Sequence, residues 1–357
     1  MPGSAFFILR SPFPMRLFFL LLALPALALA QGSLTPTGAP ATTMRTLDQL
    51  DARTPLGTPG QVTTSTITID QPGSYVLVGD ITVSAGDGIA ILSRNVTLDL
   101  NGFTISSTAP TPEGCGIKLG DANTAVRAVR IANGRIRSGT TYDDAQGGLF
   151  SGPGFLTGIG PGPDNINDAI CIRIDNIAIT GVAQAGIYCQ LASRVSHCQV
   201  RTCGGVGISA PVVSDSQALE CLSSGIVADS VYDSTGHTVA GYAGINAENI
   251  TLNSRGIRTA PTNSVGLGLH SRRIATGCQG SDTTTVWQDP EPPPAGVVSI
   301  VASYCQGTSP VVGVSGVISN QCAGDSPGIA IKAGIAVGCS TTGGGTTTAS
   351  DGKYLMP

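Results

Sequence analysis

The chain has 357 residues, of which 12% are charged and 4% are aromatic, and its formal net charge is −4. Charge this sparse excludes a solvated disordered tail or a coiled coil, and an acidic balance without basic blocks argues against a nucleic-acid partner. The 48 glycines lack the three-residue period of collagen. The composition therefore indicates an apolar chain, rich in glycine and β-branched residues, that is long enough to build one large core.

The N-terminus is typical of a secretory signal. Met15-Arg16 begins a short basic region, the stretch from Leu17 to Leu29 is apolar, and Ala28-Leu29-Ala30 is a small-x-small cleavage site. This apolar stretch is too short to span a bilayer. We therefore expect a cleaved signal at residues 1–30, with Met15 as an alternative start. The mature protein should have no membrane span and should be secreted, periplasmic or on the cell surface.

All ten cysteines lie in the part of the chain that would be exported, between Cys115 and Cys339. An even number of cysteines in an oxidising compartment permits disulfides. The sequence has no Cys-x-x-Cys pair, which argues against a zinc ribbon or a thioredoxin-like redox motif.

Internal repetition is the strongest signal in the sequence. Residues 195–200 align with residues 213–218 at an offset of 18, and the same offset relates Gly207-Ile208 to Gly225-Ile226. Each repeat contains short β-branched segments separated by Gly, Asn, Asp or Ser, without a helical period. A unit this small cannot bury its own apolar face, so the units must stack. The repeat predicts an all-β fold, a parallel β-helix with about 17–21 residues per coil.

The segments before the repeats fit the same fold and carry a resemblance. Ile67 to Leu77 alternates and turns like an N-terminal capping strand pair, and Asp87-Gly88-Ile89-Ala90-Ile91 and residues 95–105 (Asn-Val-Thr-Leu-Asp-Leu-Asn-Gly-Phe-Thr-Ile) follow it. These segments resemble the first coil of exported right-handed β-helix proteins of the pectin-lyase-like superfamily. The later Cys-x-Gly coils and the ending Lys353 to Pro357 are similar to uncharacterised bacterial secreted members.

The resemblance covers about residues 66–357 and implies a right-handed solenoid. It implies little about activity, because this fold hosts lyases, hydrolases, epimerases, adhesins and inert scaffolds. The expected domain organisation is a signal at 1–30, a flexible Thr/Pro/Gly-rich lead-in at 31–66, a β-helix domain at 67–339 with an insertion at 140–168, and a Gly/Thr-rich tail at 340–357.

The catalytic motifs of the superfamily are mostly missing. Its glycoside hydrolases carry Asn-x-Asp, Asp-Asp, Gly-His-Gly and Arg-x-Lys on successive coils, because paired carboxylates must protonate the leaving group and activate water. Here Asp143-Asp144 is the only Asp-Asp, His237 lies in Gly-His-Thr, and Arg-x-Lys is absent. The sequence therefore disfavours a hydrolase of this type.

A polysaccharide lyase would need a base and a cation, either Arg or Ca²⁺, beside a uronate carboxylate. Arg127, Arg130, Arg135 and Arg137 lie close together in the sequence, and Arg135 and Arg137 should point outward if Ile136 points inward. They are either solvated arginines on an outer face, which we favour, or an anion-binding stripe. The catalytic candidates are Arg135, Arg137, Asp143 and Asp144, and Ca²⁺ is expected as a cofactor only if the protein is a lyase.

The insertion from Thr140 to Asp168 is the clearest departure from the repeat. It is enriched in aromatic residues, whose rings can stack on sugars, and loops on a rigid scaffold often bind ligands. The alternative is a glycine-rich loop that covers the apolar edge of a coil. The ligand-binding candidates are Tyr142, Phe150, Phe155, Asp164 and Asp168.

Two other sets of residues share repeat positions. His197, Asp215 and Asp233 could form an acid–base set or a metal site, but we favour a ladder of turns, because Asp tolerates left-handed turn geometry. No metal site is predicted. Cysteines at equal repeat positions should stack as disulfides or as buried thiols, and the expected pairs are Cys171 with Cys189 and Cys203 with Cys221.

Two functional hypotheses remain. The first is a non-catalytic, secreted or cell-surface β-helix scaffold that contacts extracellular polysaccharide, favoured by the regular repeat and the missing motifs. The second is a polysaccharide lyase or another carbohydrate-active enzyme that acts on an acidic polysaccharide. We favour the first.

Overall fold

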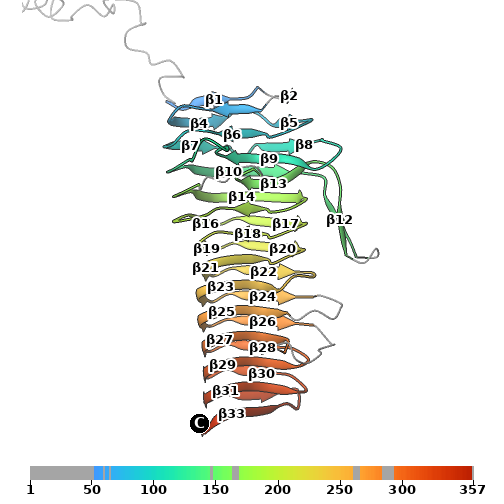
Figure 1. The fold of residues 1–357 in the computed structure, drawn as a ribbon, viewed down its shortest axis with the longest axis vertical. Helices are drawn as coiled ribbons and strands as arrows, with labels where there is room; N and C mark the ends of the chain where they lie inside the picture. Colours follow the sequence, from blue (N-terminus) through green and yellow to red (C-terminus); the bar gives the residue numbers. More distant parts are fainter. Residues whose placement is uncertain are drawn as a thin grey trace, which may run out of the picture. The chain divides into compact units, whose positions relative to one another are not determined.

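The fold is described by a computed structural model at residues 52–58, 61–63, 66–144, 148–162, 169–259, 266–283 and 293–355. These residues form parallel β-strands that stack into a solenoid of about 12 turns, and they include no α-helix (Figure 1). The prediction of an all-β parallel solenoid is confirmed. No helix in these ranges is long and apolar enough to cross a membrane. The predicted signal at residues 1–30 lies outside the described residues.

Each early coil contains three strands, one on each face of the solenoid. The first face carries β1 (Thr54–Leu56), β4 (Gly73–Leu77), β7 (Val96–Asp99), β16 (Arg194–Ser196) and β19 (Val212–Ser214). The second face carries β2 (Gln61–Thr63), β5 (Ile81–Val83), β8 (Thr104–Ser107), β17 (Gln199–Cys203) and β20 (Gln217–Cys221). The third face carries β3 (Ile67–Ile69), β6 (Ile89–Ile91), β9 (Glu113–Leu119), β13 (Phe155–Gly160), β15 (Ile187–Tyr188) and β18 (Ile208–Ser209).

Some strands run through a corner and belong to two faces. The first and second faces share β10 (Arg130–Arg137) and β14 (Arg173–Val182). The third and first faces merge in β21 (Ile226–Tyr232), β23 (Ala243–Leu252), β25 (Leu267–Thr276), β27 (Ala295–Ser303), β29 (Val312–Asn320), β31 (Ile329–Val337) and β33 (Thr346–Leu355). The second face continues opposite them in β22 (Thr235–Thr238), β24 (Arg255–Arg258), β26 (Gln279–Asp282), β28 (Gln306–Thr308), β30 (Ala323–Asp325) and β32 (Ser340–Thr342).

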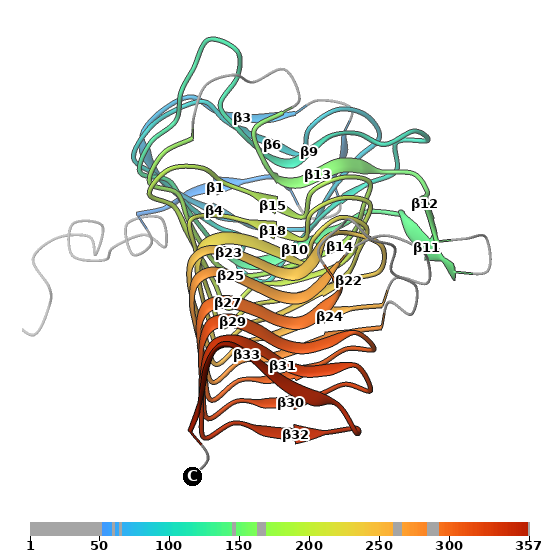
Figure 2. The same cartoon turned by 60° about the horizontal axis from the view of Figure 1, so that its bottom comes forward.

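This merging changes the C-terminal coils from three faces to two layers. In Figure 2 the long strands β29, β31 and β33 form one layer, and β30 and β32 form the other. The inward residue of the second face shrinks in step along the register, in the order Ile81, Ile105, Ile136, Ile179, Val200, Ala218, Gly236, Gly256, Gly280, Gly307 and Gly324. Large side chains therefore hold the early faces apart, and glycine lets the late layers meet.

The late layers approach so closely that a side chain at these glycines would collide with backbone. A Cβ added at Gly280 would lie 1.9 Å from the carbonyl oxygen of Gly296, and one added at Gly307 would lie 2.0 Å from that of Gly313. The opposing glycines precede an inward Ile, Leu or Val, as in Gly225-Ile226 and Gly244-Ile245. The Gly-Ile pairs of the sequence repeat therefore mark where the third face packs against the second face.

Coil length varies around this constant register. The inward positions Gly307 and Gly324 belong to successive coils joined by short turns, whereas Ile136 and Ile179 belong to successive coils separated by a much longer segment. The long coil contains the hairpin of β11 (Thr141–Asp143) and β12 (Leu149–Ser151), which projects from the stack.

The structure corrects the expected boundaries. β1 and β2 lie in the segment expected to be a flexible lead-in, and they pair with β4 and β5. β32 and β33 lie in the expected tail and pair with β30 and β31, so Ser340 to Leu355 is the last coil. β3 and β4 pair with strands of the next coil rather than with each other. The strands at both ends were not predicted because segments rich in Thr and Gly show little of the alternation of apolar and polar residues that indicates a strand.

The expected insertion is also shorter than residues 140–168. Phe155–Gly160 is the solenoid strand β13, in which Ile159 stacks between Ile117 and Ile187. Within the expected insertion, the described segment that leaves the coil is the one around β11 and β12.

Candidate functional site

The outer surface of the first and second faces around β10, β14 and β17 presents a set of polar side chains one coil apart. Arg135 and Arg137 are exposed and flank buried Ile136, as expected. Register places Arg135 beside Ala178 and Ala178 beside Gln199. Because neighbouring parallel strands are about 4.8 Å apart, side chains at equal positions form rows along the solenoid.

A ladder of left-handed turns borders this surface. Asn133, Asn176, His197, Asp215 and Asp233 occupy one register position in successive coils, each with φ between 47° and 60°. Asn176 Nδ2 donates to Asn133 Oδ1 at 3.1 Å, so the side chains also stack. Asn and Asp tolerate this backbone conformation better than most residues. The geometry confirms the turn ladder, and no cluster of His, Cys, Asp or Glu among the described residues could hold a metal ion.

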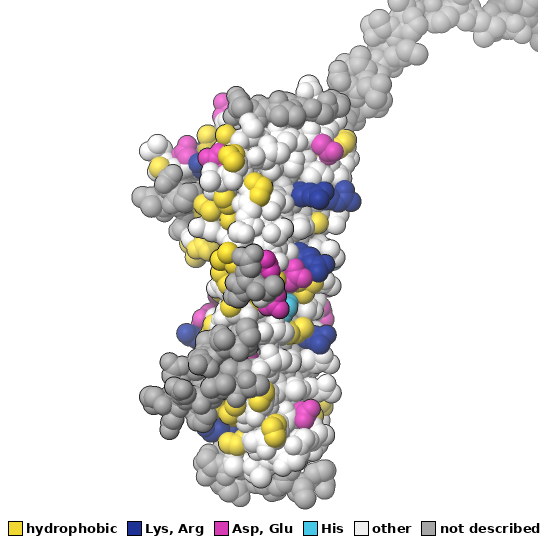
Figure 3. Space-filling view, turned by 90° about the vertical axis from the view of Figure 1, so that its right-hand side faces the viewer, with side chains coloured by type: hydrophobic (Ala, Val, Ile, Leu, Met, Phe, Trp, Pro, Cys, Tyr) yellow, Lys and Arg dark blue, Asp and Glu magenta, His cyan; other side chains and the backbone are white. Residues whose placement is uncertain are grey.

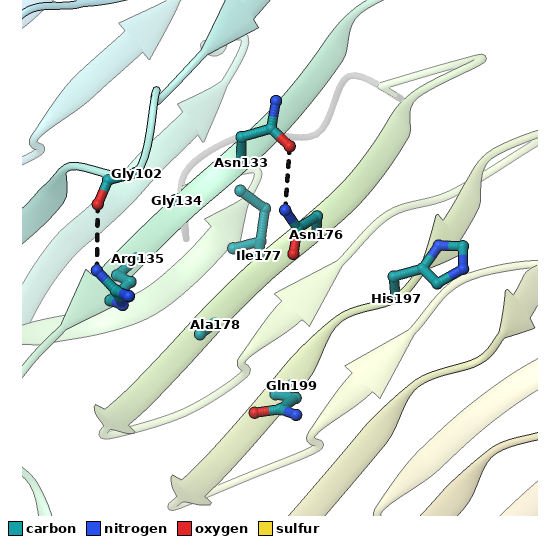
Figure 4. Close-up of a pocket in the computed structure, with 9 residues that line it drawn as sticks. All are labelled: Gly102, Asn133, Gly134, Arg135, Asn176, Ile177, Ala178, His197 and Gln199. Carbon is teal, nitrogen blue, oxygen red and sulfur yellow. Dashed lines mark hydrogen bonds between the residues drawn. The ribbon is translucent and has the colours of Figure 1, made fainter.

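A shallow groove of ≈ 280 Å³ runs between the turn ladder and the strands of the second face (Figure 4). Asn133, Asn176 and His197 lie along one side, and Arg135 and Gln199 lie along the other. Arg135 Nη1 donates to the carbonyl oxygen of Gly102 at 3.2 Å, which holds the guanidinium at the end of the groove. The groove therefore offers amide, imidazole and guanidinium groups to a polar ligand.

His197 is fixed by the coil before it. Its Nδ1 lies 3.0 Å from Asp175 Oδ1, which also accepts a hydrogen bond of 2.9 Å from Ser196 Oγ. The hydrogen bond from His197, with a smaller contribution from Ser196, holds the pKa of Asp175 below its usual range. Asp175 is therefore an ionised acceptor that orients the imidazole.

Three arginines form a row beside Asp175 on the first face. Arg130, Arg173 and Arg194 pair in register in successive coils, and all three are exposed. They line a hollow of ≈ 320 Å³ together with Asp175 and Ser196. Among the described residues, none of these arginines forms an ion pair within 4.0 Å. Like charges stacked one coil apart repel each other, so the row favours a bound anion.

The hairpin of β11 and β12 forms a second cleft on the second face. This cleft of ≈ 500 Å³ is lined by Arg137, Tyr142, Thr180, Thr202 and Glu220, together with residues 138–141. In the hairpin, the rings of Tyr142 and Phe150 have centroids 4.9 Å apart. Figure 3 views this side of the solenoid, where uncharged surface predominates and Lys and Arg side chains lie toward both edges.

Hydrogen bonds fix the polar groups of this cleft. Arg201 Nη2 donates to Glu220 Oε1 at 2.9 Å, and Thr202 Oγ1 donates to Glu220 Oε2 at 2.9 Å. The hydrogen bond from Arg201 is the main cause that lowers the pKa of Glu220. Tyr142 Oη donates to Asp144 Oδ1 at 3.0 Å, and burial, followed by this hydrogen bond, raises the pKa of Tyr142. Arg137 lines the cleft without an ion pair among the described residues.

The predicted site residues lie at several different places in the structure. Arg137 and Tyr142 line one cleft, Arg135 lines the neighbouring groove, and Asp143 and Asp144 lie on the hairpin. Phe150 stacks on Tyr142 and is partly exposed. Asp164 and Asp168 lie outside the described residues.

The expectation for Phe155 is wrong. Its side chain is fully buried in the core, because β13 is a solenoid strand and Phe155 begins it on the inward side. It is therefore unable to stack on a ligand.

The two predicted cysteine pairs have different outcomes. Cys203 and Cys221 are register partners, and their Sγ atoms are 3.3 Å apart in the core. Cys171 and Cys189 are not at equal positions. Cys171 is an exposed residue of a left-handed turn with φ of 58°, and its N–H donates to the carbonyl of Leu191, whereas Cys189 is buried. The offset that relates Cys203 to Cys221 does not hold at this earlier coil, which is longer and pairs Arg173 with Arg194.

The sequence reasoning missed Arg173, Arg194 and the two asparagines of the groove. A short motif could have revealed them, because an arginine, a β-branched residue, any residue and then a turn residue recur in successive coils. The three copies are residues 130–133, 173–176 and 194–197 (Arg-Ile-Ala-Asn, Arg-Ile-Asp-Asn and Arg-Val-Ser-His). The unequal spacing of the three copies along the chain concealed the repeat.

No family model matches the chain, and neither a curated protein nor a solved structure matches it.

Proposed function

We propose that this protein is an exported, non-catalytic β-solenoid scaffold that contacts extracellular polysaccharide, with a preference for acidic chains. The observation that carries the proposal is the row of Arg130, Arg173 and Arg194, exposed at equal positions of successive coils. A linear anionic polymer presents charges at a regular spacing, and a row of cations about 4.8 Å apart is suited to follow it along the solenoid.

The neighbouring hollows support a sugar as the repeating unit. Asn133, Asn176 and Gln199 offer both donors and acceptors, which is what vicinal hydroxyl groups require. Tyr142 at the hairpin cleft offers an amphipathic ring beside Arg137. Together these groups, on two adjoining faces, supply charge neutralisation, amide hydrogen bonding and an aromatic contact.

Export is the second part of the proposal and rests on the N-terminal signal pattern at residues 1–30. A right-handed solenoid of the pectin-lyase-like kind remains the expectation that we attach to this fold. Expression with the native N-terminus, followed by N-terminal sequencing of the exported protein, tests the export directly. A new N-terminus at Gln31 supports it, and an uncleaved protein inside the cell contradicts it.

One observation favours a lyase as the second candidate function. Arg135 and His197 line the same groove, and Asp175 orients the imidazole. A lyase on an acidic polysaccharide needs a cation to neutralise the uronate carboxylate and a base to remove the neighbouring proton. In that reaction His197 would accept the proton from carbon, the C–O bond to the leaving sugar would break as a C=C bond forms, and the leaving oxygen would take a proton from water.

One experiment separates the two candidates. The purified protein is tested for retention on a panel of acidic and neutral polysaccharides, and each retained polysaccharide is monitored for the ultraviolet absorbance of an unsaturated product. Retention of acidic polymers without absorbance supports the scaffold. A rising absorbance that is lost in His197→Gln identifies a lyase. Absence of retention on every polymer contradicts both.

A further inference from the structure

One buried corner position carries only Ser or Cys in eight successive coils. It directly follows the left-handed turn residue, and its members are Cys198, Ser216, Ser234, Ser254, Cys278, Cys305, Cys322 and Cys339. We call this set the Ser/Cys column. Every member is buried. The column runs through the solenoid parallel to the row of turn residues.

The serines show what the position requires structurally. Ser216 Oγ donates to the carbonyl oxygen of Ser214 at 2.7 Å and accepts the N–H of Cys198 at 3.1 Å. Ser234 and Ser254 repeat this arrangement. A small polar side chain therefore satisfies the corner, and serine fulfils the role without any redox chemistry.

The four C-terminal members are all cysteines, in consecutive coils. Backbone hydrogen bonds keep them in step, with the N–H of Gln306 donating to the carbonyl of Cys278 at 2.8 Å and that of Ala323 donating to the carbonyl of Cys305 at 2.8 Å. The four thiols have the same orientation, because each donates to the carbonyl oxygen two residues before it, at 3.3 Å for Cys278 and Cys305, 3.4 Å for Cys322 and 3.5 Å for Cys339. The strand spacing of about 4.8 Å lies within the Cα separation of disulfides, about 4.4–6.8 Å.

We propose that oxidation joins this column in two inter-coil disulfides, Cys278–Cys305 and Cys322–Cys339. All four are thiols in this structure. Each cysteine has column neighbours only in the adjacent coils, so this pairing is the one that uses all four. The alternative, Cys305–Cys322, would leave both end cysteines without a partner.

The chemistry is thiol–disulfide exchange with an external disulfide, such as oxidised glutathione or the disulfide of an oxidoreductase. One column thiolate attacks the external disulfide, and the second column thiol then displaces the mixed disulfide. For each bridge one S–S bond forms in the protein and one breaks in the oxidant, which leaves as two thiols carrying the two protons and two electrons.

Burial determines when this step occurs. The attacking species is the thiolate, and the hydrogen bond with Cys278, together with burial, raises the pKa of Cys305 to about 12. The same hydrogen bond lowers the pKa of Cys278, so in the folded protein Cys305 is protonated, while burial shields all four thiols from an oxidant. The bridges form while the last coils are still open, and they then fasten the C-terminal end of the stack, where strand edges are otherwise free to fray.

Peptide mapping of the full chain tests the pairing. The reduced, unfolded protein is refolded in a glutathione redox buffer, alkylated under denaturing conditions and digested. Trypsin must be combined with elastase, because no Lys or Arg lies between Arg273 and Lys332. We expect the four column cysteines to escape alkylation and to appear in two linked peptides that reductant separates. Full alkylation of the four, or a Cys305–Cys322 link, overturns the proposal.

Matched variants distinguish bridging from packing. Cys322→Ser and Cys198→Ser place the same side chain in the same column, where serine already occupies three coils, so both should fold. Reduction should lower the melting temperature of the oxidised wild type and of Cys198→Ser by about 4–10 °C, and that of Cys322→Ser by clearly less. Equal shifts in all three proteins would assign the cysteines a packing role only.

Discussion

Because Gly280 has no side chain, the two layers of a late coil are able to approach each other closely. A Cβ at this position would lie 1.9 Å from the carbonyl oxygen of Gly296. We predict that Gly280→Val lowers the free energy of unfolding by about 3 kcal/mol or more, because neither layer is able to move without breaking ladder hydrogen bonds. Urea denaturation measures the change.

Gln279 gives the control on the same strand, because its side chain is exposed. Gln279→Val should change the free energy of unfolding by less than about 0.5 kcal/mol. If both variants have the stability of the wild type, the close approach of the layers is wrong.

A buried ion pair makes a second prediction at this scale. The side chains of Arg258 and Asp282 are both completely buried, and Arg258 Nη1 lies 3.0 Å from Asp282 Oδ1. Asp282→Asn keeps the size but removes the carboxylate charge beside the buried guanidinium, so it should cost about 3–5 kcal/mol. The exposed pair Arg272–Glu248, with N and O atoms 2.9 Å apart, is the control, and Glu248→Gln should cost less than about 1 kcal/mol. Similar costs in the two variants would contradict the burial of the first pair.

Among the elements, the hairpin of β11 and β12 can be separated from the solenoid. Its two strands pair only with each other, whereas β10 and β13 on either side pair with the stack. We predict that replacing Thr141–Ser151 with a short glycine linker leaves the melting temperature within a few degrees. The same replacement should weaken polysaccharide binding several-fold, because the cleft loses Tyr142. Thermal denaturation and calorimetry check the two parts.

Tyr142→Ala is the matched variant for this deletion. It should reproduce most of the loss of binding if the ring contacts the ligand. Undiminished binding by both variants would exclude the hairpin from the site and leave the arginine row as the contact.

At the level of elements, the sequence predicts what repeats and fails where the repeat changes length. Gly207-Ile208 and Gly225-Ile226 revealed the parallel stacking, and the register confirms them. The tripeptides Cys278-Gln279-Gly280 and Cys305-Gln306-Gly307 follow from one rule, namely corner cysteine, outward residue and inward glycine. The row of Arg130, Arg173 and Arg194 was missed because segments of unequal length separate its members, so no fixed offset along the chain relates them.

For the molecule as a whole, acid should destabilise the fold in two stages. Burial is the main cause that lowers the pKa values of His237 and His270 below the ordinary 6.5. Hydrogen bonds lower those of Asp175 and Glu220 below 3.8 and 4.5. Every one of these groups binds its proton more weakly when folded. The stabilisation that these groups contribute is therefore complete above their unfolded pKa values and is lost as the pH falls. The two histidines lose it below about pH 6.5, and the two carboxylates lose it below about pH 4.

Melting temperatures at about pH 7.5, 5.5 and 3.5 measure these stages. The N–H of Glu220 donates to His237 Nδ1 at 3.4 Å, and protonation of this nitrogen removes the acceptor. A His237→Gln/His270→Gln double variant should therefore show a smaller fall between about pH 7.5 and 5.5. A melting temperature that rises on acidification contradicts the assignment.

The central claim is that the arginine row binds an acidic polysaccharide, and calorimetry on the polymer that the wild type retains tests it most directly. The Arg173→Gln/Arg194→Gln double variant removes two members of the row, and Arg255→Gln removes an exposed arginine farther along the solenoid. We predict that the double variant binds at least about five-fold more weakly, because each charged hydrogen bond contributes on the order of 1 kcal/mol, while Arg255→Gln binds as the wild type does. Equal affinity of the three proteins would contradict the account.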